Sequence, residues 1–254
     1  MSDEGGLRPA DPWSVLRRHT PARIGLGRAG TSLPTAEVLR FAAAHAQARD
    51  AVHVPLDMPA LAAALEADGW QTLQARSRAP TREDYLRRPD WGRRLDEASA
   101  TGLRHAASGP VDLAIVVADG LSATATQQHA VLLLRALREA LAGALCIAPL
   151  VIATQARVAL ADEVGELLQA RIALILLGER PGLSSPDSLG AYLTHGPRVG
   201  CTDSQRNCIS NIRPQGLAPE AAAQRIAWLL KEALRRGLSG TALKDDSEME
   251  LLPR

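Results

Sequence analysis

The stretch IALILLGERPGLSSPDSLG, residues 172–190, decides the fold prediction. Its first six residues are all apolar, and Gly178, Glu179, Arg180 and two prolines follow them. A short continuous apolar run that ends in turn residues is typical of a strand buried on both faces of a parallel sheet. A carboxylate that leaves such a strand needs a hydrogen-bond donor. For Glu179, the donor is either an arginine elsewhere in the chain or an N–H group of a ligand.

The segments around this stretch repeat the same pattern. Residues 111–120 (VDLAIVVADG) and 145–153 (LCIAPLVIA) are predicted strands, and residues 123–143, 161–170 and 219–237 are predicted helices. Residues 186–196 are predicted to start another helix, and residues 201–213 are predicted to form a polar loop. Buried strands that alternate with helices indicate an α/β fold, with a Rossmann-like, mostly parallel sheet flanked by helices.

The first hundred residues have a different pattern. Residues 34–50 and 58–69 have helical periodicity, and residues 81–105 are predicted to form two charged helical pieces that break before Pro89. Little strand signal is present, so this part is predicted to be a helical arm ahead of the sheet. The predicted organisation is a flexible arm (1–20), a helical region (21–107), an α/β domain (108–240) and a C-terminal tail (241–254).

Composition excludes several classes of function. The 254 residues carry a formal net charge of +1, which argues against nucleic acid or an anionic membrane as the main partner. No apolar run approaches the ~20 residues of a membrane span, and the acidic start of the chain does not resemble a signal peptide. Cys146, Cys201 and Cys208 have no CxxC spacing, as expected for a protein of the reducing cytoplasm.

One motif suggests a nucleotide site. Residues 25–30 (GLGRAG) fit the G-x-G-x-x-G fingerprint, which requires a strand before it and a helix directly after it. Only PARI precedes the motif, and TSLP delays the next helix. Asp50 has the right spacing for the acidic residue of the fingerprint, but it ends a predicted helix rather than a strand. The motif is therefore interpreted as a glycine-rich turn, with a dinucleotide site as the alternative.

The predicted strand ends are more informative, because open parallel sheets bind ligands beyond the carboxyl ends of their strands. Asp119 follows one strand and either bonds a ligand or fixes its own turn. Val158, considered alone, is a core residue. Cys208 is a poor candidate nucleophile and His195 a surface histidine, since neither has a catalytic partner nearby in the sequence.

Complete catalytic motifs are missing from the sequence. It contains no G-x-S-x-G motif, Walker loop, metal-binding cluster or paired carboxylates at catalytic spacing. The chain therefore has loops that suit a ligand but no complete set of catalytic residues. This combination favours a binding subunit over a complete enzyme.

Five stretches together carry a family resemblance. PARIGLGRAGTSLPT, VVADGLSATA, ARVALADEVGELL, GERPGLSSPDSLGAYLTHGPRVGCTDSQRNCISNIR and LSGTALKDD closely resemble the small subunit of ethanolamine ammonia-lyase, from about Thr20 to Asp246. The resemblance implies an adenosylcobalamin-dependent lyase that converts ethanolamine, or a related vicinal amino alcohol, to an aldehyde and ammonia by radical chemistry. It implies a hetero-oligomer in which a large catalytic subunit holds the substrate and the cobalamin lies at the interface.

Carried over residue by residue, the family's cobalamin contacts fall on Val158, Glu179 and Cys208 of the α/β domain. No catalytic residue is expected in this chain, and the isolated chain is expected to be inactive. The chain lacks the Asp-x-His-x-x-Gly motif whose histidine replaces the cofactor's lower base, so the resemblance implies base-on cobalamin. It also allows a location inside a bacterial microcompartment, where relatives are often housed.

Two alternatives stay open at this point. The first is a self-sufficient dinucleotide-binding oxidoreductase that uses the turn from Gly25 to Gly30. The second is an assembly subunit without a cofactor, in which the helical arm binds a large subunit and the α/β domain only braces it.

Overall fold

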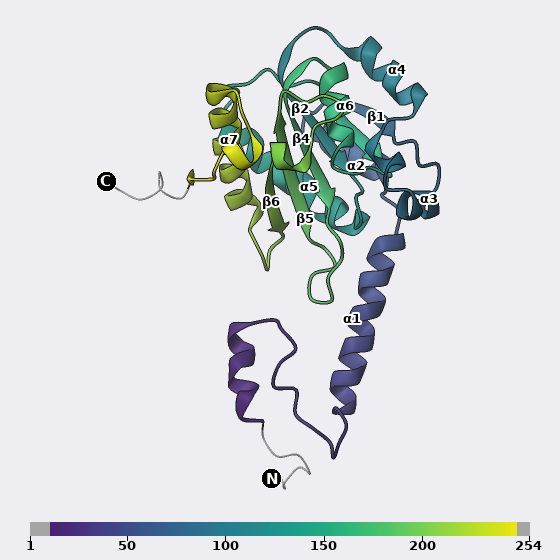
Figure 1. The fold of residues 1–254 in the computed structure, drawn as a ribbon, viewed down its shortest axis with the longest axis vertical. Helices are drawn as coiled ribbons and strands as arrows, with labels where there is room; N and C mark the ends of the chain where they lie inside the picture. Colours follow the sequence, from purple (N-terminus) through teal and green to yellow (C-terminus); the bar gives the residue numbers. More distant parts are fainter. Residues whose placement is uncertain (1–10, 248–254) are drawn as a thin grey trace, which may run out of the picture.

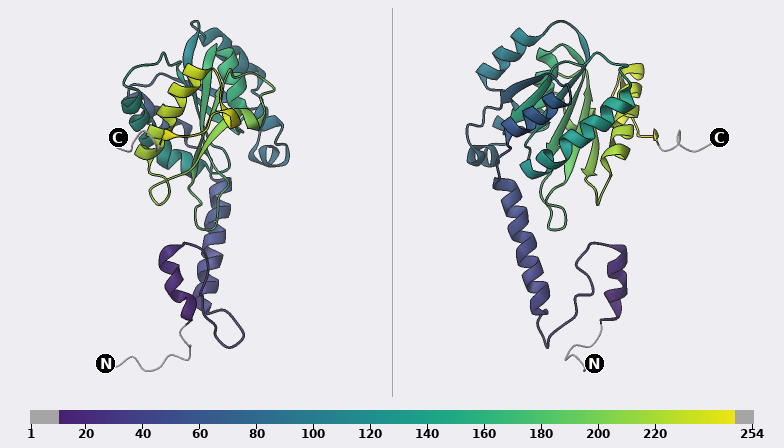
Figure 2. Two further views of the ribbon diagram at one scale, coloured as in Figure 1. Left: turned by 60° about the vertical axis from the view of Figure 1, so that its left-hand side comes forward. Right: turned by 180° about the vertical axis from the view of Figure 1, so that it is seen from behind.

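The computed structural model describes residues 11–247, and Figure 1 shows their fold. The predicted flexibility of residues 1–10 and the end of the predicted tail lie outside the described residues. A 3₁₀ helix, η1 (Pro12–His19), and a long helix, α1 (Thr35–His53), come first. Helix α1 extends away from the sheet, and Arg17 of η1 lies 3.5 Å from Glu37 of α1 (Figures 1 and 2). The predicted helix at 34–50 is thus confirmed.

Six strands form one mixed sheet in the order β1-β3-β2-β4-β5-β6. Strands β1 (Thr72–Arg76), β3 (Leu150–Thr154), β2 (Val111–Ala118) and β4 (Ala170–Gly178) are parallel. Strand β5 (Leu189–His195) runs antiparallel to β4, and β6 (Arg206–Ile212) antiparallel to β5. The predicted α/β fold with a mostly parallel sheet is confirmed.

Alternate residues of the central strands build two separate cores. Leu113, Ile115 and Val117 of β2 pack on the face covered by α2 (Met58–Ala67), α5 (Ala123–Leu141) and α7 (Pro219–Arg236). Ala114, Val116 and Ala118 face α4 (Glu97–Ala106) and α6 (Leu160–Leu167). Every side chain of β2 after Asp112 is fully buried, which explains the unbroken apolar run in its sequence.

Two predictions in the C-terminal half are wrong. Residues 186–196 were predicted to start a helix, but Leu189–His195 is strand β5. Residues 201–213 were predicted to be a loop, but Arg206–Ile212 is strand β6. Both strands are stabilised by antiparallel pairing with residues far away in the sequence, a contact that local periodicity does not report.

A third prediction is wrong in the N-terminal half. The region was predicted to contain little strand structure, yet Thr72–Arg76 forms β1 at the edge of the sheet beside β3. Only Leu73 and Ala75 are apolar in this five-residue strand, because it covers an edge rather than the core. The two charged helical pieces do form, as α3 (Arg82–Arg87) and α4, with a short 3₁₀ turn, η2 (Trp91–Arg93), between them.

Candidate binding pocket

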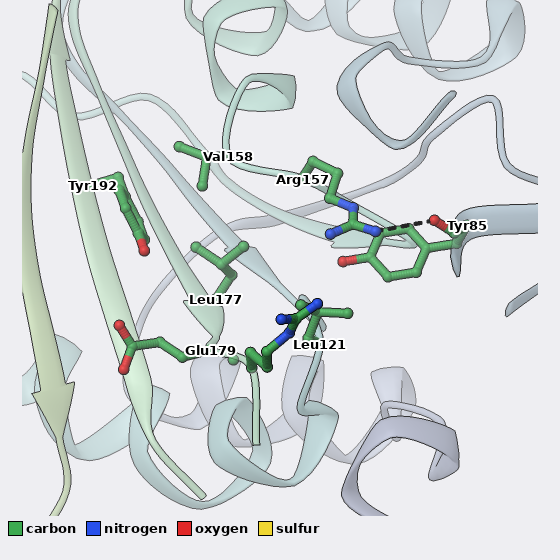
Figure 3. Close-up of a pocket in the computed structure, with 9 residues that line it drawn as sticks. Tyr85, Leu121, Arg157, Val158, Leu177, Glu179 and Tyr192 are labelled. Carbon is green, nitrogen blue, oxygen red and sulfur yellow. Dashed lines mark hydrogen bonds between the residues drawn. The ribbon is translucent and has the colours of Figure 1, made fainter. Parts of the chain in front are cut away.

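A pocket of about 460 Å³ opens where β2, β3 and β4 end (Figure 3). Leu121 comes from the turn after β2, Val158 from the loop after β3, and Glu179 from the residue after β4. The carboxyl ends of parallel strands meet at one edge of a sheet, which brings these three residues together. The complete lining is Tyr85, Leu121, Arg157, Val158, Leu177, Gly178, Glu179, Arg180 and Tyr192.

The Glu179 carboxylate is held by donors of this chain. Ser188 donates its hydroxyl hydrogen to Oε2, Ser210 donates to Oε1 at 2.5 Å, and the Asn211 backbone N–H donates to Oε2 at 3.1 Å. The arginine pairing considered from the sequence is not found for Glu179 within residues 11–247. A carboxylate accepts about four hydrogen bonds, so an acceptor position remains on Oε1.

A bulge in β6 brings two of these donors to Glu179. Leu189 of β5 pairs with Ile212 and Ala191 pairs with Ile209, so two residues of β6 lie opposite one residue of β5. The extra residue leaves Asn211 with a φ of 60°. Bulges of this kind redirect side chains and are frequent next to functional sites.

Gly190 gives the carboxylate its space. A Cβ atom on Gly190 would lie 3.0 Å from both Cγ and Oε1 of Glu179. A side chain at this position would therefore crowd the Glu179 carboxylate and the Tyr192 ring.

Val158 and Cys208 differ in their relation to the pocket. Val158 lines it while also packing against the core under α4 and α6, so the core interpretation and the contact interpretation both apply. Cys208 does not line it, but lies on β6 directly opposite Tyr192, which does. Burial raises the pKa of the Cys208 thiol, and its hydrogen bond with Tyr192 only partly offsets this. The thiol is therefore protonated near neutral pH and unsuited to attack as a thiolate.

Asp119 has a structural partner. Its buried carboxylate accepts hydrogen bonds from the backbone N–H groups of Gln155 and Ala156, at 2.8 and 3.1 Å. Arg82 lies 3.6 Å from the same carboxylate. Asp119 therefore fixes the loop after β3, which carries Arg157 and Val158 into the pocket, and a backbone hydrogen bond from Gly120 also ties it to its own turn.

Five lining residues were not singled out from the sequence. Tyr85 of α3 is fully buried and donates its hydroxyl hydrogen to the carbonyl of Ala156. Its ring centroid lies 4.6 Å from the Arg82 guanidinium and 4.3 Å from that of Arg157. Strand-end position was a usable signal for three of the missed residues, but no sequence signal marked Tyr85 or Tyr192. The five are Tyr85, Leu121, Arg157, Arg180 and Tyr192.

Other predicted features lie elsewhere. The glycine-rich turn belongs to the segment between η1 and α1, and from residue 11 onward no strand comes before it (Figure 2). His195 pairs with Ile172 at the opposite end of β4 from Glu179. Residues 11–247 contain no group of histidine, cysteine, aspartate or glutamate side chains suited to a metal ion. In the same part of the chain, no helix has the length and apolar character that crossing a bilayer requires.

The close approach of the turn after β2 to the end of β4 leaves no room for a side chain at Gly178. A Cβ there would lie 1.9 Å from the Ser122 carbonyl oxygen, and Leu121 N–H already donates to the Gly178 carbonyl at 2.8 Å. We expect Gly178→Ala to lower the free energy of unfolding by about 3 kcal/mol, as measured by urea denaturation. Gly102→Ala is the matched control, because Gly102 lies on α4 with open space around it. The control substitution should leave the free energy of unfolding unchanged or raise it by up to ~1 kcal/mol. Equal effects of the two substitutions would contradict the steric argument.

Fold and pocket together define an α/β protein with a pocket at the strand ends that is lined by both charged and apolar side chains. The family model "Ethanolamine ammonia-lyase light chain (EutC)" matches residues 10–244. An ethanolamine ammonia-lyase small subunit from Ralstonia nicotianae is 56% identical over 260 residues, which cover 99% of this chain and 96% of the relative. Small subunits from Azotobacter vinelandii and Pseudomonas putida are 58% and 56% identical, over 95% and 96% of this chain and 91% of each relative. The chain belongs to the ethanolamine ammonia-lyase light chain family, whose members are subunits of a carbon–nitrogen lyase.

Proposed function

We propose that this chain helps to bind adenosylcobalamin at the interface with the large catalytic subunit of ethanolamine ammonia-lyase. In the resulting hetero-oligomer, ethanolamine is converted to acetaldehyde and ammonia. The observation that carries the proposal is the meeting of Val158 and Glu179 in one strand-end pocket, in a chain of this family. The two residues are 21 positions apart in the sequence and were assigned to the cofactor by resemblance alone.

The residues of the pocket fit the periphery of a corrinoid. A corrin ring bears amide side chains, whose N–H groups suit the remaining acceptor position of the Glu179 carboxylate. Val158 supplies an apolar contact, and the β6 residues from Asn207 to Ser210, with Cys208 among them, supply contacts beside it. An open pocket of about 460 Å³ takes only part of such a ligand, so the large subunit would enclose the remainder.

The division of labour follows from these groups. Adenosylcobalamin, bound base-on, supplies the radical chemistry. This chain's residues place the cofactor and shield it from water, while the residues that contact the substrate belong to the large subunit. Location in the cytoplasm, with or without a microcompartment, is part of the same proposal.

Removal of the carboxylate tests the proposal. In the complex with the large subunit, we expect Glu179→Ala to weaken cobalamin binding by roughly 1.5–3 kcal/mol, because a charge-assisted acceptor is lost. Equilibrium dialysis with adenosylcobalamin measures this. Glu139→Ala on the exposed side of α5 is the control and should bind as the wild type does. Unchanged affinity of the Glu179 variant would remove the residue from the proposed site.

An assembly role without a cofactor has one observation in its favour. Trp13, Leu39 and Phe41 of η1 and α1 are exposed, which favours a contact with another chain. A complex that forms but retains no cobalamin would support this role instead. The dinucleotide alternative lacks the required strand, and titration of the chain with NAD(P) checks it directly.

A further inference from the structure

The strand-end pocket contains more positive than negative charge. Arg157 and Arg180 both line it, and Glu179 is the single carboxylate among the lining residues. The Glu179 oxygens already accept hydrogen bonds from Ser188, Ser210 and Asn211, so the carboxylate is directed toward β5 and β6. No ion pair links Glu179 to either arginine in the described part of the chain.

Neither arginine has a carboxylate partner among residues 11–247. Between residues 11 and 247, Arg180 makes no hydrogen bond or ion pair, although it follows a carboxylate in the sequence. Arg157 donates from Nη2 to the Tyr85 carbonyl at 3.2 Å, and its Nε is buried without a partner. Figure 3 shows the Arg157 guanidinium beside the Tyr85 ring, where stacking fixes its plane. A buried guanidinium N–H without an acceptor costs free energy until one arrives.

A third arginine nearby shows the contrast. Arg82 also contacts Tyr85, but its guanidinium donates to the carbonyls of Val52 and Gly120 and lies 3.6 Å from the Asp119 carboxylate. Its Nη2 is also buried without a partner, so the contrast lies in the charge, which Asp119 balances inside the fold. No carboxylate of the described residues pairs with Arg157 or Arg180, and both side chains line the pocket.

We propose that Arg157 and Arg180 form an anion subsite that binds the phosphodiester of the cofactor's nucleotide tail. The inference rests on the proposed function. The corrin amides are neutral donors and acceptors, whereas the phosphodiester of the tail is anionic, and a guanidinium matches its oxygens with paired N–H groups. In one pocket, Glu179 would accept a hydrogen bond from a corrin amide, while Arg157 and Arg180 would bind the phosphodiester. Contacts to both groups at once would fix the rotation of the cofactor about its axis.

Binding measurements on the complex with the large subunit test this subsite. Arg180→Gln and Arg157→Gln should each raise the Kd for adenosylcobalamin roughly 10-fold to 100-fold, because each removes a charged donor. The slope of log Kd against log salt concentration should become smaller in both variants. Arg198→Gln is the matched control: its exposed side chain follows β5 at the opposite end of β4, and its affinity should equal that of the wild type. Circular dichroism melting curves establish that the variants are folded.

Corrinoids without parts of the tail locate the contact. Cobinamide lacks the phosphodiester, and cobinamide phosphate restores a phosphate without the lower base. Arg180→Gln should raise the Kd for cobinamide phosphate as much as it raises the Kd for cobalamin. It should change the Kd for cobinamide less than about twofold. An equal loss for cobinamide, or an unchanged salt slope with cobalamin, would overturn the subsite. If the wild-type complex binds no cobalamin, the proposed function itself fails. If it binds and the arginine variants match it, only the anion subsite fails.

Discussion

Deamination of ethanolamine is expected only when this chain and the large subunit are combined with adenosylcobalamin. Among residues 11–247, the strand-end pocket contains no nucleophile paired with a base. Burial raises the pKa of the Tyr192 hydroxyl well above its ordinary value and also raises that of the Cys208 thiol, so both groups keep their protons near neutral pH. Neither group can act as the base of a deamination.

The measurement is acetaldehyde formation by each subunit alone and by the mixture. We expect the rate of acetaldehyde formation by either subunit alone to be at least about 10⁶-fold lower than that of the complex. This factor is the lower end of the range of enzymatic rate enhancements. A mixture with heat-denatured small subunit provides the control and should show no gain over the large subunit alone. Turnover by this chain without its partner would contradict the division of labour proposed above.

Loss of Arg206 should have the largest effect on stability. Its guanidinium bonds both carboxylate oxygens of Asp162 and also donates to Thr194 and to the Cys201 carbonyl, at 3.0 and 2.8 Å. The side chains of Arg206 and Asp162 are only 3% and 2% exposed. Arg206→Ala would leave a buried carboxylate without a counter-charge, so we expect the free energy of unfolding to fall by about 3–5 kcal/mol in urea denaturation.

Two further variants separate the buried charge from packing. Arg235→Ala removes an arginine from an exposed ion pair with Glu232 and should cost no more than about 1 kcal/mol. The double variant Arg206→Met, Asp162→Leu removes both charges while keeping apolar volume, so it should be more stable than Arg206→Ala. If the double variant is the less stable of the two, uncompensated charge is not the cause of the loss.

The sequence predicts the centre of this fold better than its edges. Strands β2 and β4 are buried on both faces, so their apolar runs are long and unbroken, and helices α5 and α7 show a clear period. Strands β1, β5 and β6 lie toward the edges, where polar residues interrupt the apolar pattern and the partner strand stabilises the structure. Their existence depends on contacts that no local window contains.

The same distinction applies to the pocket. Residues in the segments that follow β3 and β4, such as Val158 and Glu179, can be placed near one another once parallel strands are predicted. The donors to Glu179 cannot, because Ser210 and Asn211 reach it through an antiparallel pairing and a bulge that the sequence did not reveal. Tyr85 enters from a short helix before the central sheet, and only the folded chain brings it beside Arg157.

The position of β6 in the sequence determines when the Glu179 site can be completed during synthesis. Glu179 is synthesised at the end of the central strands, but its Ser210 and Asn211 donors come about thirty residues later. A nascent chain that stops before Arg206 includes Ser188 and the residues of the parallel strands, but it lacks the two β6 donors that orient this carboxylate. The proposed cofactor-binding surface is therefore completed only after β6 has been synthesised and has paired with β5.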